Sequence, residues 1–190
     1  MDIDAASFAR TLWLVFYAYW AYTARMTKET AARESSRSRT THLLAVAAGY
    51  GLILWDDFLP TPLVLPILRS SKLQENIGLV TMVIGMGWAV WARLQLGQNW
   101  SAAVTLKHEH HLIRTGPYRF VRHPIYTGIV LGSLGTAIVM NQVWGAAGFL
   151  LIFGAYLVKL RKEEVLLASH FPKDYPSYKS HTKRLFPFLF

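Results

Sequence analysis

The residues of this chain that could do chemistry gather in two short stretches of its second half. The first contains Arg122 and His123, directly before Pro124. Proline suits the first turn of a helix, where positively polarised N–H groups and basic side chains together favour an anionic group. The second stretch contains the acidic pair Glu163-Glu164, just beyond a long apolar run. Ionisable residues so close to hydrocarbon are costly, so both stretches are candidates for a functional site.

The composition indicates that a membrane positions these residues. The chain has 190 residues, of which 53% are hydrophobic and 16% are charged. A soluble domain usually has about 25% charged residues. This composition excludes a disordered chain, and the absence of cysteine excludes disulfides, thiolate zinc sites and a cysteine nucleophile. The net charge of +9 does not indicate nucleic-acid binding here, because it occurs together with long apolar runs.

Five apolar stretches are long enough to be read as membrane-spanning helices, which need about 20 mostly apolar residues. Only Arg10 and the final Lys159 carry charge within them. The polar break at Asn141-Gln142 predicts a tight helical hairpin between the last two. The predicted fold is therefore an all-α integral membrane protein with about five transmembrane helices. The predicted spans are residues 7–24, 40–55, 76–92, 125–140 and 143–159.

The distribution of basic residues predicts the orientation of these spans. Of the 20 Lys and Arg residues, all but Arg10, Arg69 and Lys72 fall on one predicted side. The positive-inside rule makes that side cytoplasmic. An odd number of spans then leaves the N-terminus external and the C-terminus, with both chemical stretches, cytoplasmic.

Two motifs resemble the isoprenylcysteine carboxyl methyltransferase family. One is Gly116-Pro-Tyr-x-x-x-Arg-His-Pro-x-Tyr-x-Gly128, and the other is Glu163-Glu-x-x-Leu167 followed by Phe171, Tyr175 and Tyr178. The resemblance covers residues 96–187. It implies an integral-membrane methyltransferase that uses S-adenosylmethionine and takes a lipophilic, prenylated substrate from the bilayer. The cofactor pocket would be formed by the loop before the fourth span and the C-terminal helix. We therefore expect one membrane domain, 1–190, with three spans in 1–92 and the methyltransferase motifs in 93–190.

The resemblance also assigns roles to individual residues. Asn99, Trp100 and Ser101 match an upstream motif and are expected on the substrate side of the pocket. The expected catalytic set is Arg122, Lys159, Arg161, Glu163 and Glu164, in which either Lys159 or Arg161 would face an acceptor carboxylate. The expected cofactor contacts are His111, Leu112, Ile113, Gly116, Pro117, Tyr118, Arg122, His123, Pro124, Tyr126 and Glu164.

Several alternatives remain at this stage. His108-Glu-His-His111 looks like a metal cluster but lacks the i, i+4 spacing of a helical zinc site, so no metal is expected. The acidic pair could instead be a solvated partner of Lys159. The acceptor could be a phospholipid amine, which needs a general base, or a small lipophilic thiol. The rival class is a transporter or a membrane scaffold without enzymatic activity.

Overall fold

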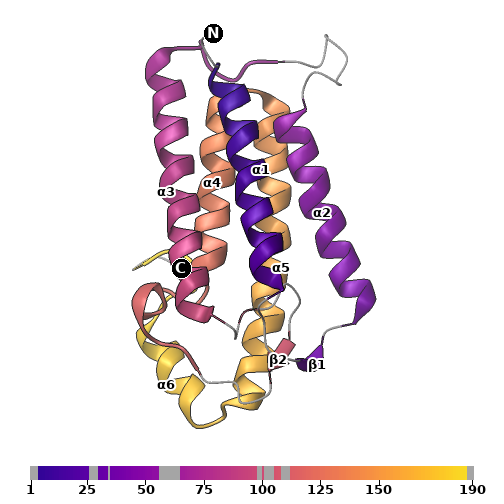
Figure 1. The fold of residues 1–190 in the computed structure, drawn as a ribbon, viewed down its shortest axis with the longest axis vertical. Helices are drawn as coiled ribbons and strands as arrows, with labels where there is room; N and C mark the ends of the chain where they lie inside the picture. The colour runs from indigo at the N-terminus through magenta and orange to yellow at the C-terminus, as the bar shows by residue number, and fades with distance from the viewer. Residues whose placement is uncertain are drawn as a thin grey trace.

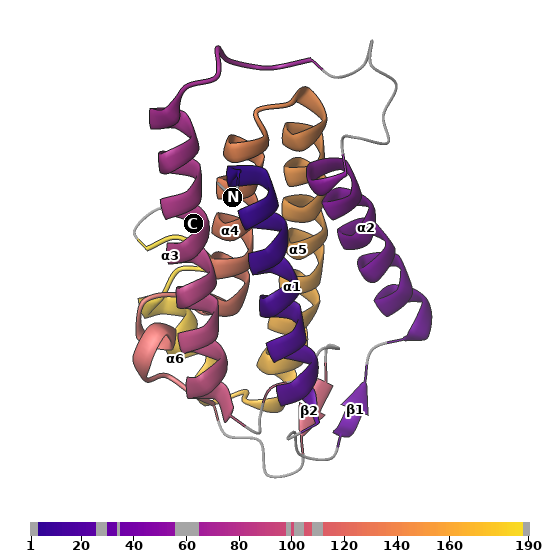
Figure 2. The same ribbon diagram turned by 45° about the horizontal axis from the view of Figure 1, so that its top comes forward.

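The protein forms an antiparallel bundle of five long helices in the computed structural model (Figure 1). The structure describes residues 4–25, 30–33, 35–55, 65–97, 100, 105–107 and 112–187. The 3₁₀ helix η4, the short helix α6 and the two-stranded antiparallel pair β1–β2 lie at one end of the bundle (Figures 1 and 2). The elements are α1 (Ala5–Ala24), β1 (Thr30–Arg33), α2 (Ser36–Leu54), α3 (Lys72–Leu96), β2 (Thr105–Lys107), η4 (Gly116–Arg119), α4 (Pro124–Met140), α5 (Val143–His170) and α6 (Asp174–His181).

The five long helices coincide with the five predicted apolar stretches. The predicted hairpin between α4 and α5 is confirmed: Asn141 ends α4 in the left-handed conformation, with φ 53°, and donates its N–H to the Ala137 carbonyl. Helix α5 continues beyond the last predicted span, from Lys159 to His170. This extension places the acidic pair on a helix that projects beyond the apolar part of the bundle.

Two helices, α3 and α5, are long and apolar enough to cross a membrane, and α4 is a shorter apolar helix. In the most apolar 18-residue window of each long helix, only 39% and 33% of the residues are buried inside the protein. The core helix of a soluble protein would bury most of that surface. Large apolar side chains instead point outward, such as Leu73 at 71% exposure and Ile84 at 60%. Such an apolar exterior is suited to lipid.

Helices α3 and α4 pack with their backbones in direct contact. A Cβ on Gly128 would lie 2.6 Å from the Ala89 amide nitrogen, and a Cβ on Gly135 would lie 2.8 Å from the Cα of Met82. Small residues permit this close approach between membrane helices. Gly132 lies close to two helices: a Cβ on it would lie 3.2 Å from the Trp13 ring on α1, and a Cβ on Gly85 of α3 would meet the Gly132 amide nitrogen.

Polar side chains inside the bundle hydrogen-bond across helices. Trp13 Nε1 donates to Thr136 Oγ1 at 2.8 Å, and the Tyr50 and Ser133 hydroxyls are 3.0 Å apart. Arg10 Nε donates to the Leu54 carbonyl at 2.8 Å, at the end of α2. These bonds join α1 and α2 to the rest of the bundle and satisfy groups that would be costly to leave unpaired in an apolar interior.

Candidate active site

A buried ion pair joins the beginning of α4 to the extension of α5. Arg122 Nε and Nη2 lie 2.9 and 2.8 Å from Glu164 Oε1, and the two side chains are only 6% and 7% exposed. Pro124 begins α4 two residues after this arginine, so the helix start fixes the position of Arg122. The two predicted chemical stretches, 42 residues apart in sequence, therefore meet at one place.

His123 links both carboxylates of the acidic pair. Its Nδ1 lies 3.4 Å from Glu163 Oε2, and its Nε2 lies 3.7 Å from Glu164 Oε1. The ring stacks on that of Tyr126, with centroids 5.6 Å apart and planes 5° apart, and the Tyr126 hydroxyl donates to Glu163. Reading the acidic pair as a solvated surface set is wrong, because Glu164 is 6% exposed and the Glu163 side chain only 22%.

Burial alone would lower the pKa of His123, because it disfavours the charged imidazolium. The facing carboxylates of Glu163 and Glu164 more than offset that effect, and the pKa of His123 lies above its ordinary value. The imidazole is therefore held in its protonated form at higher pH than a solvent-exposed histidine, beside Arg122 and two carboxylates.

The C-terminal segment after α6 closes over this cluster. The backbone N–H groups of Arg122 and His123 donate to the carbonyls of Lys183 and Arg184, at 2.8 and 3.0 Å. Arg184 Nε reaches Glu164 Oε2 at 3.1 Å, and Leu185 is fully buried. The sequence analysis did not single out Arg184. No local pattern marks that arginine, because its partner is 20 residues away and is brought near only by the turn at α6.

The Gly116 to Tyr118 motif forms η4 beside the cluster. Gly116 has φ 59°, and a Cβ there would lie 2.9 Å from Gln95 Oε1, so only glycine fits without strain. Tyr118 is buried, and its carbonyl accepts a hydrogen bond from the Tyr178 hydroxyl at 2.6 Å. This bond ties η4 to α6. Of the other expected cofactor contacts, Leu112 and Ile113 are half-buried, and Pro117 and Pro124 are buried.

The two candidate cations on α5 are separated by the structure. Lys159 is buried, with its Nζ 5.4 Å from the centre of the Tyr126 ring, next to the cluster. Arg161 is exposed, two residues further along the helix and therefore about 200° around it. The structure thus brings Lys159, and not Arg161, to the charged cluster.

Of the upstream motif, only Trp100 lies within the described residues, since Asn99 and Ser101 lie outside them. The expected cofactor contact His111 also lies outside them. Trp100 is buried, and the Arg93 guanidinium lies 4.4 Å from its ring centre. Trp20 meets it edge-on at 6.0 Å. The ring of Trp100 therefore contacts side chains of α1 and α3. Within the described residues no group of three or more His, Cys, Asp or Glu side chains could hold a metal ion, and His108 to His111 fall outside them.

A pH dependence follows from the raised pKa of His123. The protonated ring contributes stability that is fully present below its unfolded-state pKa of about 6.5 and is lost as pH rises through the folded-state value. Thermal stability of the purified protein should therefore fall as pH rises above about 6.5. His123→Gln should be less stable than the parent at low pH and lack this part of the fall. Equal slopes in the two proteins would contradict the assignment.

Comparison with known proteins identifies a similar family. The sequence profile of the isoprenylcysteine carboxyl methyltransferase (ICMT) family matches residues 77–169, which run from α3 to the end of α5. The matched segment, just under half of the chain, is similar to this methyltransferase family. The matched segment contains Arg122, His123, Tyr126 and both acidic residues of the cluster, so the predicted resemblance is confirmed.

Relatives within the family share modest identity over most of the chain. A probable protein-S-isoprenylcysteine O-methyltransferase of Oryza sativa is 26% identical over 136 residues, covering 70% of this chain and 71% of the relative. Protein-S-isoprenylcysteine O-methyltransferase A of Arabidopsis thaliana is 25% identical over the same length. The human protein-S-isoprenylcysteine O-methyltransferase is 26% identical over 138 residues, but the match spans only 49% of it.

A solved structure shares the fold of this chain. It is described as the eukaryotic intramembrane Ras methyltransferase ICMT, and it matches with a TM-score of 0.62 and 24% identity. The match covers 79% of this chain and 53% of the solved one.

Proposed function

We propose that this protein transfers a methyl group from S-adenosylmethionine to a lipophilic acceptor at the membrane, with the carboxylate of an isoprenylcysteine-type substrate as the acceptor. The observation that carries the proposal is the buried cluster at the start of α4, in which Arg122, His123, Glu163 and Glu164 stand together. Perturbed ionisable groups gathered in one place are typical of active sites.

The residues present fit a cofactor with both signs of charge. S-adenosylmethionine supplies an electrophilic methyl group on a sulfonium and also carries an ammonium and a carboxylate. Carboxylates from α5 can pair with its positive groups, and Arg122 offers a cation for its negative group. His123 Nε2 is buried without a hydrogen-bond partner, and its distance of 3.7 Å from Glu164 is too long for a hydrogen bond. This nitrogen is therefore available to hydrogen-bond a ligand.

Lys159 is the cation suited to the acceptor. It lies at the edge of the cluster, over the Tyr126 ring, and on the side of α5 that faces α2. A carboxylate acceptor is already ionised at neutral pH, so no general base is required. The work of the protein would then be alignment and exclusion of water, which can together lower a barrier by about 7–11 kcal/mol. The tail segment around Leu185, packed over the cluster, would help to exclude water.

The membrane arrangement that accompanies this proposal has five spans. The N-terminus would be external, and α6 with the charged cluster would be cytoplasmic. The alternation of α1 to α5 in the bundle and the uneven distribution of Lys and Arg support it (Figure 1).

Binding of labelled S-adenosylmethionine to the detergent-solubilised protein tests the proposal first. Saturable binding is expected, followed by methyl transfer to a farnesylcysteine analogue with a free carboxylate. A prenylated amine and a prenylated thiol serve as the competing acceptors. No binding at millimolar cofactor would refute the function, whereas transfer to the amine or the thiol alone would refute only the acceptor.

Glu164→Gln tests the role of charge at the cluster. Glutamine keeps the size and one oxygen acceptor for Arg122 but removes the negative charge. A neutral hydrogen bond contributes about 1 kcal/mol, or about fivefold, so we expect kcat/KM to fall by more than about tenfold. The matched control is Glu75→Gln, at an exposed pair with Lys72, which should leave kcat/KM unchanged. Full activity of Glu164→Gln with normal cofactor affinity would remove the acidic pair from the site.

A further inference from the structure

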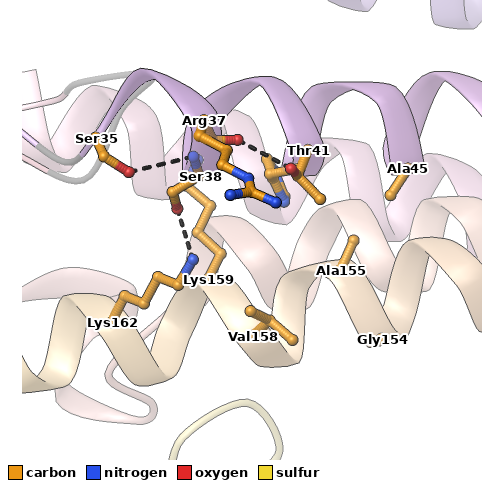
Figure 3. A pocket seen from close by; sticks show the side chains of 11 residues that line it. Ser35, Arg37, Ser38, Thr41, Ala45, Gly154, Ala155, Val158, Lys159 and Lys162 are labelled. Atoms are coloured by element: carbon orange, nitrogen blue, oxygen red, sulfur yellow. Dashed lines mark hydrogen bonds between the residues drawn. The ribbon is translucent and has the colours of Figure 1, made fainter.

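A pocket of about 450 Å³ lies between α2 and α5, beside the charged cluster (Figure 3). It forms because the backbones of the two helices come into contact near one end and then diverge. Gly49 and Gly148 bring their backbones together: a Cβ on Gly49 would lie 2.8 Å from the Gly148 carbonyl oxygen. From that contact α2 leans away from α5 toward its N-terminal end (Figure 1). The resulting pocket, which we call the wedge, has a volume large enough for part of a small molecule.

The two ends of the wedge differ in chemistry. The open end carries three cations, Arg37, Lys159 and Lys162, and no acidic residue is among the eleven that line the pocket. Lys162 Nζ donates to Ser38 Oγ at 2.5 Å, so a hydroxyl lies among the cations (Figure 3). The narrower part is lined by small and apolar side chains, namely Ala45, Gly154, Ala155 and Val158. A ligand with an anionic head and an apolar chain matches this division.

The outer end of the wedge, at Lys162, faces away from Glu164. Lys162 and Glu164 are two residues apart on α5 and therefore point about 200° apart around the helix. Glu164 faces Arg122 on the α4 side, whereas Lys162 faces Ser38 on α2. Lys159 stands between the two sites, because it both lines the pocket and lies over Tyr126. The outer two cations, Arg37 and Lys162, have no place in the proposed methyl-transfer site.

We propose that this wedge binds an anionic membrane phospholipid, with its phosphate at Arg37 and Lys162 and an acyl chain along Gly154 and Val158. Basic pockets between transmembrane helices are suited to anionic lipid head groups, and the apolar floor is suited to a chain. The charge of the pocket excludes zwitterionic lipid as the preferred occupant. Bound lipid would fill the space where α2 diverges from α5 and hold the two helices together.

Native mass spectrometry of the detergent-solubilised protein tests the head-group contacts without any methyl-transfer assay. Dioleoyl phosphatidylglycerol and dioleoyl phosphatidylcholine are offered at equal concentration, and the anionic lipid should be retained in preference. Each cation near a lipid surface changes affinity by about fivefold, so Arg37→Gln with Lys162→Gln should weaken phosphatidylglycerol binding by about twentyfold or more. Arg39→Gln is the control, an exposed residue two positions along α2 that does not line the pocket.

Gly154→Leu tests the acyl-chain part of the pocket. A Cβ on Gly154 meets no atom within 4 Å, so a leucine side chain would begin in open space beside the pocket and occupy part of it. Phosphatidylglycerol retention should fall, while the equally open Gly87→Leu on α3 should leave it unchanged.

Three results would overturn the proposal. The first is equal retention of both lipids by the parent protein. The second is a loss in Arg39→Gln as large as in the double variant. The third is displacement of phosphatidylglycerol by a farnesylcysteine carboxylate but not by its methyl ester, which would make the wedge part of the acceptor site.

Discussion

Arg122→Ala is expected to lower the free energy of unfolding by about 3–5 kcal/mol, the usual cost of removing one partner of a buried ion pair. The substitution leaves Glu164 buried without its guanidinium, and it also removes side-chain bonds to the carbonyls of Lys179 and Thr182. The tail should therefore detach from the cluster as well.

Denaturant titration in a defined detergent measures this effect, with limited proteolysis reporting the release of the tail. Arg114→Ala is the matched control, because Arg114 pairs with Asp174 at 2.7 Å but both side chains are well exposed. Exposed pairs contribute about 0–1 kcal/mol. If the two variants unfold at the same denaturant concentration, the buried cluster does not stabilise the protein as described.

Gly128→Leu is expected to prevent the bundle from assembling. Its Cβ alone would meet the Gly85 carbonyl and the backbone and Cβ of Ala89, so α3 and α4 would have to move apart along their length. Overpacking a close interface usually lowers the free energy of unfolding by about 1–3 kcal/mol. The neighbouring atoms here are mostly backbone and cannot move aside, so we expect a loss at or above the upper end of that range. The yield of monodisperse protein after solubilisation and its thermal midpoint measure the effect.

Gly87→Leu is the control for that experiment, since Gly87 is exposed on α3 and a Cβ there meets nothing within 4 Å. The added side chain points outward and should change the thermal midpoint little. A Gly128→Leu protein as stable as the Gly87→Leu protein would show that α3 and α4 do not meet through their backbones.

The sequence by itself determined the helices and the residue types of the site. Apolar runs of span length are a local property, so five long helices and the hairpin at Asn141 could be predicted from composition alone. The motif residues Arg122, His123 and Glu164 could be singled out because ionisable groups beside hydrocarbon are costly and rarely kept without a use. The end of the last helix could not be placed, because a charged helical extension has no apolar signal.

Only the tertiary structure decided how these residues pair. Arg184 reaches Glu164 because α6 turns the chain back, a long-range approach that no local spacing encodes. Lys159 and Arg161 are equivalent cations in sequence, and the rotation of α5 selects Lys159 for the interior. The wedge beside Arg37 exists because Gly49 and Gly148 touch and the helices then diverge. Each outcome depends on the direction in which a helix presents its side chains. The packing of the helices sets that direction, and the residue types alone do not.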